Sequence, residues 1–129
     1  MTDLILMQGA ARYIRCERLA DAETELCGYG RRPLLLHGQR ALEAVRDELP
    51  AILARNGVQP VDWLNDGFCS RRQLRRAAED ARRAQCDFVL AVGGGKCMDL
   101  GKAVAAELRM PVVTLPTVAA TAVSATADR

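Results

Sequence analysis

VLAVGGGKCMDLGKAVAAELRMPVVTLPTVAATAVSAT (residues 89–126) places three consecutive glycines between an apolar run and a segment with helical spacing. The apolar run begins upstream as CDFVLAV (residues 86–92) and is continuous, which is typical of a strand buried in a parallel sheet. Residues 96–110 carry apolar side chains three and four positions apart and predict a helix, and PVVTLP (residues 111–116) predicts a second strand. The stretch therefore reads as strand, glycine turn, helix and strand.

The same alternation recurs upstream. RPLLLHG (residues 32–38) predicts a strand, and the spacing of apolar residues over 41–57 predicts a helix. Pro50 lies inside that helical segment and has no N–H to donate, so we expect the helix to kink or restart there. VQPVDWL (residues 58–64) is a further candidate strand.

Shorter features complete the pattern. Ser70 followed by Gln73 has the spacing of a capping box and predicts the start of a helix over residues 70–85. ARYIRC (residues 11–16) is a candidate edge strand, and residues 17–28 form a candidate helix. Strands and helices thus alternate along most of the chain.

This alternation predicts the fold class. Strands that alternate with helices of this length pair in parallel through right-handed crossovers, and the helices then cover both faces of the sheet. We therefore expect one α/β domain over residues 1–129, with a doubly wound parallel sheet. Ligands of such sheets bind at the carboxyl ends of the strands. Here that edge carries Gly38, residues 93–96 and residues 116–121.

Composition excludes several classes of protein. The 129 residues are 50% hydrophobic and carry a formal net charge of +2, which is enough for one core and demands no polyanionic partner. The five cysteines form no C-x-x-C pair, which argues against a disulfide framework and a zinc site. No apolar run has the roughly 18 residues of a membrane span, and the N-terminus has no basic region of a signal peptide. We expect a cytoplasmic protein without a membrane partner.

The glycine turn is the strongest local candidate for a binding site. A strand that feeds a helix through glycines leaves backbone N–H groups uncovered at the positive end of the helix dipole, where a pyrophosphate can bind. Lys96 in the first helical turn opposes the dipole and would suit the same anion. The alternative is a tight turn with Lys96 directed into water. Met98 stands where the G-x-G-x-x-G fingerprint needs glycine, and no Ser or Thr follows Lys96 as a P-loop requires.

The wider spacing resembles the metal-dependent, iron-containing alcohol dehydrogenase family, which includes glycerol dehydrogenase. That family has GGGK or GGGS, then Asp and Lys on the next helix, then a strand ending in P-T-x-A-x-T. The matching residues here are Gly93, Gly94, Gly95, Lys96, Asp99, Lys102, Pro116, Thr117, Ala119 and Thr121. The resemblance implies the Rossmann-like N-terminal half of that fold, which dehydroquinate synthase shares more distantly.

The resemblance also implies a cofactor and a reaction. The cofactor would be NAD or NADP, and the reaction a hydride transfer between the nicotinamide and a small alcohol, polyol or hydroxy acid. The implied cofactor-binding residues are Gly93, Gly94, Gly95, Lys96, Asp99, Thr117, Thr121 and Gly38. A local alternative remains for some of them, because Asp99 can complement the helix N-terminus and the threonines can satisfy loop backbone. Lys102 is expected to pack its stem and pair with an acid.

Some residues depart from the family pattern. Gly38 stands near the place of the acid that holds the adenosine ribose and selects NAD, and Arg40 nearby would suit the 2′-phosphate of NADP. Ala122 stands where glycerol dehydrogenase has an acid near its substrate, which weakens the polyol interpretation. His37 is the only histidine and is expected to be a strand-end residue rather than a catalyst.

The metal of the family is not expected in this sequence. Members of the family are much longer, and their iron or zinc ligands, an aspartate and two or more histidines, come from a helical second domain. The resemblance therefore implies a truncated chain that binds nucleotide, with no catalytic or metal-ligating residue of its own and no dehydrogenase activity alone. Because residues 111–123 are apolar and uncharged, we also expect the isolated chain to self-associate.

A second interpretation keeps the fold and drops the chemistry. The chain would then be a non-catalytic nucleotide-binding module or a degenerate relative. The arginine-rich helix over residues 70–85 would offer a nucleic-acid surface, but Glu79, Asp80 and the small net charge favour a solvated outer face. A homo-oligomer is an open alternative to a monomer.

Overall fold

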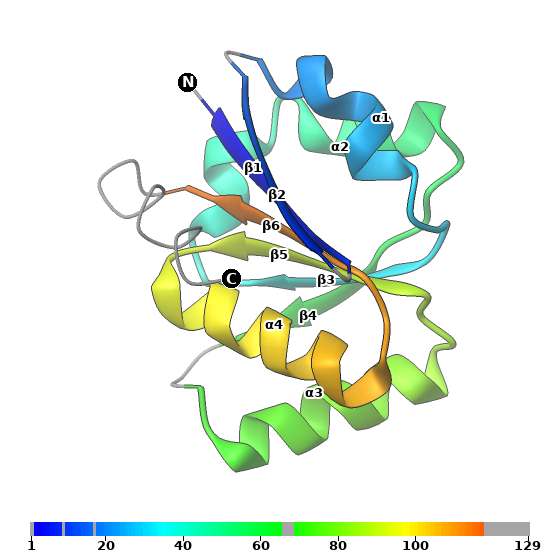
Figure 1. The fold of residues 1–129 in the computed structure, drawn as a ribbon, viewed down its shortest axis with the longest axis vertical. Coiled ribbons are helices and arrows are strands. Elements are labelled where there is room, and N and C mark those ends of the chain that lie inside the picture. The colour runs from blue at the N-terminus through cyan, green and yellow to red at the C-terminus, as the bar shows by residue number, and fades with distance from the viewer. Residues whose placement is uncertain (1, 9, 17, 66–68, 118–129) are drawn as a thin grey trace.

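The computed structural model describes residues 2–8, 10–16, 18–65 and 69–117 and shows a six-stranded sheet with helices on both sides (Figure 1). The strand order is β2-β1-β6-β5-β3-β4. The strands are β1 (Thr2–Gln8), β2 (Ala10–Cys16), β3 (Pro33–His37), β4 (Val61–Leu64), β5 (Phe88–Gly93) and β6 (Val112–Pro116). The helices are η1 (Leu19–Ala22), α1 (Glu23–Cys27), η2 (Ala41–Val45), α2 (Leu49–Arg55), α3 (Arg71–Arg83) and α4 (Gly95–Leu108), where η denotes a 3-10 helix.

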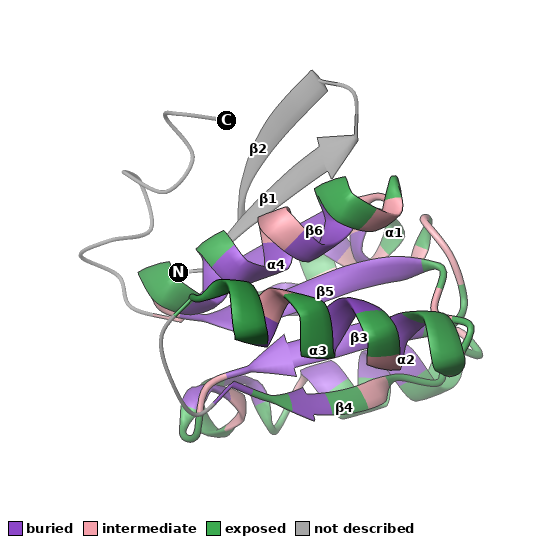
Figure 2. Ribbon diagram, turned by 90° about the horizontal axis from the view of Figure 1, so that it is seen from below, coloured by how far each residue is buried: buried purple, intermediate pink, exposed green. Residues whose placement is uncertain are grey.

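Four strands form the parallel part of the sheet. β3 pairs in parallel with both β4 and β5, and β5 pairs in parallel with β6. Every residue of β3, β5 and β6 is buried, as expected for strands that are covered on both faces (Figure 2). The doubly wound parallel architecture is therefore confirmed, with β5 inside the sheet.

An N-terminal hairpin extends this parallel sheet. β1 pairs antiparallel with both β2 and β6, and β2 forms the edge. The edge strand expected at residues 11–16 is confirmed. The strand at Thr2–Gln8 was not predicted, because no helix separates it from its neighbour in the chain and it therefore breaks the alternation between strands and helices.

Alternate residues of the central strands point into two cores. Leu35, Leu90 and Val92 face the side covered by η1, α1, η2 and α2. Leu36 and Ala91 face the side covered by α3 and α4. Figure 1 shows these helical layers on opposite sides of the sheet. The period-two alternation of a strand thus feeds both cores from one continuously apolar sequence.

Proline and glycine set the bounds of the helices after β3. The expected helix over 41–57 is divided into η2 and α2, and Pro50 occupies the first turn of α2, where a missing N–H costs nothing. Gly57 follows the end of α2 with φ of +70°, a left-handed conformation that glycine adopts without strain. The restart at Pro50 is confirmed. Within the described ranges, no helix combines the length and apolarity needed to cross a bilayer.

One half of the expected capping box is present at α3. The Ser70 hydroxyl oxygen accepts a hydrogen bond from the backbone N–H of Gln73 at 3.2 Å. The Gln73 side chain instead donates a hydrogen bond to Oδ1 of Asn65 at 3.1 Å. Asn65 directly follows β4. The side chain expected to cap the helix therefore ties the start of α3 to the carboxyl end of β4.

Candidate functional site

The carboxyl ends of three parallel strands meet at one edge of the sheet. His37 at the end of β3 pairs with Val92, and Gly93 at the end of β5 pairs with Pro116 at the end of β6. These strands therefore end side by side at one edge of the sheet (Figure 1). Three of the predicted positions, Gly38, Gly94 and Thr117, directly follow the strands.

The turn between β5 and α4 requires glycine at its first position. Gly93 has φ of +152°, a conformation that residues with a side chain rarely adopt. A Cβ added there would lie 3.1 Å from the Cβ of Cys97. Gly94 follows as the N-cap of α4 with an extended backbone, and no side chain caps the helix there. The first turn of α4 therefore presents its N–H groups without a capping side chain.

The space over this turn is open. Gly95, the first residue of α4, is exposed, and a Cβ built on it would meet no atom within 4 Å. Lys96 and Asp99, in the first and second turns of α4, are also exposed, and Lys102 is half-buried. An open helix N-terminus without a side-chain cap fits a pyrophosphate, because backbone donors and the helix dipole both favour an anion at that place.

The loop after β6 begins against the same turn. The backbone N–H of Thr117 donates to the carbonyl oxygen of Gly93 at 3.1 Å, and Thr117 is half-buried. The structure therefore brings Thr117 to the glycine turn, as the spacing predicted. Ala119, Thr121 and Ala122 lie outside the described residues.

Gly101 sets how closely α4 approaches the sheet. A Cβ on Gly101 would lie 2.6 Å from the Cβ of Ala91 in β5, which is closer than two such atoms can stand. Because α4 carries the glycine turn at its start, this close packing also fixes where the turn lies. Gly101 lies on the buried face of α4, and a glycine on the apolar side of a helical pattern is the sequence signal for such close packing.

Cys97 links the first turn of α4 to the ends of two strands. Its thiol is buried and lies 3.4 Å from the carbonyl oxygens of Leu36 and Val92, at the ends of β3 and β5. Burial raises the pKa of the Cys97 thiol to about 12, so the group stays protonated and donates to a carbonyl. The sequence offered no sign of this role beyond the position of Cys97 next to the glycine turn.

His37 is held by contacts to both ring nitrogens. The buried ring has Nδ1 2.8 Å from the carbonyl oxygen of Gly38 and Nε2 2.8 Å from Oδ1 of Asp62. His37 is the last residue of β3, so its predicted position at a strand end is confirmed. The two contacts fix the ring beneath Gly38 and the loop that follows.

Gly38 and Arg40 form the other side of the edge. A Cβ on Gly38 would meet no atom within 4 Å, so there is room above this residue. Arg40 is exposed and precedes η2, and it has no ion pair with another described residue. This part of the edge is therefore open and carries positive charge.

The described residues do not fit a metal centre. Among residues 18–65 and 69–117, together with the two described N-terminal strands, no three His, Cys, Asp or Glu side chains are grouped so that they could hold a metal ion.

Residues 11–127 match the model of a protein family described as iron-containing alcohol dehydrogenase. The chain therefore belongs to that family, as the GGGK turn and the P-T-x-A-x-T spacing indicated.

Individual relatives agree with this assignment. Hydroxycarboxylate dehydrogenase A of Escherichia coli is 33% identical over 90 residues, which are 70% of this chain and 24% of that protein. Glycerol dehydrogenase of Escherichia coli is 42% identical over 55 residues, or 43% of this chain and 15% of that protein. The crystal structure of NADH-dependent butanol dehydrogenase A from Thermotoga maritima superposes with a TM-score of 0.57 at 29% identity, covering 67% of this chain and 22% of that one. The chain thus spans about a quarter or less of the length of each.

Proposed function

We propose that this chain is the dinucleotide-binding part of a family oxidoreductase and that residues 93–96 bind the pyrophosphate of NAD or NADP. The observation that carries the proposal is the open N-terminus of α4, which has no side-chain cap and begins at glycines. The parallel sheet places this helix end at the carboxyl edge, where α/β folds of this kind bind their ligands. Residues 1–129 act in this proposal as one nucleotide-binding domain.

The backbone of the turn does the binding in this proposal. The N–H groups of Gly94 and Gly95 donate to the pyrophosphate oxygens, and Lys96 adds a charge at the same end of the helix. Gly93 keeps the chain in a conformation that leaves those donors facing outward. Asp99, Thr117 and Thr121 serve the ribose and nicotinamide side of the cofactor.

The nicotinamide, when bound, supplies the hydride acceptor or donor. Residues at the carboxyl edge of the sheet would hold and orient the dinucleotide for that transfer. The names of the relatives support a small alcohol, polyol or hydroxy acid as the partner in hydride transfer. The part of the chain that the structure describes would bind and orient the cofactor.

The adenosine end of the site favours NADP. Gly38 supplies no carboxylate that would repel a 2′-phosphate, and the space above it is open. Arg40 lies two residues further along the chain and is exposed, and a guanidinium is a group that can bind phosphate oxygens in pairs. The carboxylate of Asp62 is engaged by His37 in the structure. We therefore expect NADPH to bind more tightly than NADH.

A non-catalytic nucleotide-binding module is the second candidate, and the same open turn favours it. The two candidates share the cofactor site and differ only in hydride transfer.

Calorimetric titration with NADH and NADPH tests the site that both candidates share. Gly95→Val is the informative variant, because the built Cβ meets no protein atom and so the substitution should leave the fold intact while it blocks backbone approach by the pyrophosphate. Ala106→Val is the matched control, since Ala106 is exposed near the other end of α4. Binding that is lost in Gly95→Val and kept in Ala106→Val supports the proposal. Equal binding by both variants contradicts it.

A further inference from the structure

Within the described ranges, the ion pairs of the α3 arginines lie toward the C-terminal end of the helix. Arg82 Nη2 lies 3.9 Å from Glu107 Oε2 on α4. Arg83 Nη2 lies 2.5 Å from Glu79 Oε1, and its Nη1 lies 3.9 Å from Asp80 Oδ1. Both arginines of the last turn therefore have carboxylate partners.

The arginines of the first two turns have no carboxylate partner among the residues that the structure describes. Arg71, Arg72 and Arg75 are exposed and make no ion pair with any residue in the described part of the chain. Arg76 contacts only a neutral group, with Nη1 3.4 Å from Oε1 of Gln73. The uncompensated charge of α3 is thus gathered in its N-terminal half.

Helix stability does not explain this placement. The first turn of α3 contains no acidic residue, and its arginines stand at the positive end of the helix dipole, which disfavours cations. Arg71 and Arg75 are also four residues apart on one face, where like charges repel. Positive charge at this end of the helix is therefore better explained by an anion that it attracts.

The N-terminal end of α3 lies along the same edge as the glycine turn. α3 follows β4 and α4 follows β5, and β3 pairs in parallel with both strands. Both helices pack on the same face of the sheet, so their first turns emerge at the same edge (Figure 1). The pKa of the Cys69 thiol, just before α3, is raised by burial and then by the negative charge of Asp99 in α4. The start of α3 and the N-terminal part of α4 are therefore close to each other.

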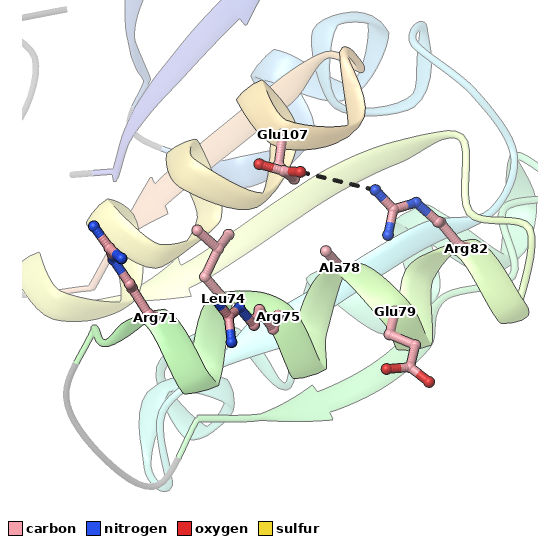
Figure 3. Close-up of a pocket in the computed structure, with 7 residues that line it drawn as sticks. All are labelled: Arg71, Leu74, Arg75, Ala78, Glu79, Arg82 and Glu107. Atoms are coloured by element: carbon pink, nitrogen blue, oxygen red, sulfur yellow. Dashed lines mark ion pairs between the residues drawn. The ribbon is translucent and has the colours of Figure 1, made fainter.

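A groove of about 520 Å³ runs between α3 and α4 (Figure 3). The Arg82–Glu107 pair lies at one end of it. At the other end, the Arg71 side chain extends beside the N-terminal half of α4. The open, positive end of the groove therefore points toward the part of α4 that carries the glycine turn.

We propose that Arg71, Arg72 and Arg75 guide the anionic dinucleotide electrostatically to the glycine turn of α4. This inference rests on the proposed function. The arginines act through their long-range field, which attracts the approaching anion and also stabilises it once it is bound, and they do not contact the bound cofactor. The pyrophosphate and, in NADPH, the 2′-phosphate supply the negative charge that their field attracts. Such guidance weakens with salt, since the screening length falls from about 30 Å at 0.01 M to about 8 Å at 0.15 M.

Two double variants of the 129-residue chain distinguish the effect of charge near the glycine turn from the effect of the net charge of the chain. Arg71→Gln/Arg75→Gln and Arg82→Gln/Arg83→Gln remove the same charge from the same helix at opposite ends. The dissociation constant of NADPH is measured for both at about 10 mM and about 300 mM sodium chloride, and melting curves confirm that both fold. We expect Arg71→Gln/Arg75→Gln to bind on the order of threefold more weakly than wild type at low salt and equally at high salt. Arg82→Gln/Arg83→Gln should match wild type at both.

Other outcomes would overturn the proposed electrostatic guidance. An equal loss at both salt concentrations would mean direct contact, and an equal loss in both variants would mean a net-charge effect. Salt-sensitive binding of duplex DNA that is tighter than that of NADPH, and is lost in Arg71→Gln/Arg75→Gln, would assign the arginines to nucleic acid. If the wild-type chain does not bind NADPH at all, the proposed function is overturned as well. If it binds NADPH with an affinity that does not depend on salt, only the electrostatic guidance is overturned. Should Arg71→Gln/Arg75→Gln not fold, Arg72→Gln is compared with Arg83→Gln in its place.

Discussion

The backbone N–H of Thr117 donates a hydrogen bond to the carbonyl oxygen of Gly93 at 3.1 Å, and this bond holds the first residue after β6 against the glycine turn after β5. Two segments that are 24 residues apart in the sequence are thereby held at one edge of the sheet. Because the bond joins backbone atoms, its geometry depends on the strand register and on the conformation of Gly93 rather than on any side chain. The account of the cofactor site depends on this arrangement.

Gly101→Ala should destabilise the fold by about 1–2 kcal/mol, because crowding against Ala91 outweighs the gain in helix propensity. Urea unfolding measures the change. The double variant Gly101→Ala/Ala91→Gly removes the opposing Cβ and should recover part of the loss relative to Gly101→Ala. If the double variant loses more unfolding free energy than the two single variants lose together, close packing at this point is not the cause.

Glu23 should make the fold sensitive to acid. Hydrogen bonds from Arg55 and Asn56 lower the pKa of this carboxyl from 4.5 to about 2. A carboxyl with a lowered folded-state pKa contributes stability that is complete above pH 4.5 and is lost as the pH falls toward 2. Glu23→Gln should therefore show a flatter dependence of unfolding free energy on pH in that range. Curves for Glu23→Gln and wild type that run parallel from pH 4.5 to 2 would refute this coupling.

Cys97 should be unreactive in the folded chain. Its thiol is buried and has a pKa of about 12, whereas Cys69 is exposed. Iodoacetamide at neutral to mildly basic pH, followed by peptide mass spectrometry, should label Cys69 first and Cys97 only after unfolding in urea, because the thiolate is the reacting form. If Cys97 in the native state is labelled as fast as Cys69, the Cys97 thiol is exposed to the reagent, which contradicts its burial.

Gly38→Asp should shift cofactor preference from NADPH toward NADH. The structure has room for the new side chain, whose carboxylate would repel a 2′-phosphate and accept hydrogen bonds from ribose hydroxyls. We expect the ratio of the two dissociation constants to change by about tenfold, equivalent to ~1.4 kcal/mol. Gly38→Asn has nearly the same shape without the charge and is the control. An equal change in both variants would make the effect steric.

The sequence predicted the parts of the site that depend on local pattern. The apolar run into Gly93, the helix predicted from residue 96 and observed from Gly95, and the edge shared by Gly38, Gly94 and Thr117 follow from the alternation of strands and helices. The structure confirms where these elements lie. The role of each residue toward a cofactor stays a prediction.

Contacts that depend on strand register were beyond sequence reasoning. The approach of His37 to Asp62 requires β3 and β4 to pair as they do, and the contact of Cys97 with Leu36 requires α4 to close on β3 and β5. The β1 strand was missed because its antiparallel partners lie next to it in the chain and at the far end of the chain, in β2 and β6. Each of these features rests on tertiary pairing rather than on a local period.

Backbone amide chemical shifts during titration with NADPH test the central claim most directly. The account predicts that the largest changes in a ¹⁵N–¹H correlation spectrum occur at the amides of Gly94, Gly95 and Lys96, and that Gly95→Val abolishes them while its spectrum remains that of a folded chain. Changes that are absent at these amides, or that persist unaltered in Gly95→Val, would contradict the assignment of the glycine turn as the pyrophosphate site.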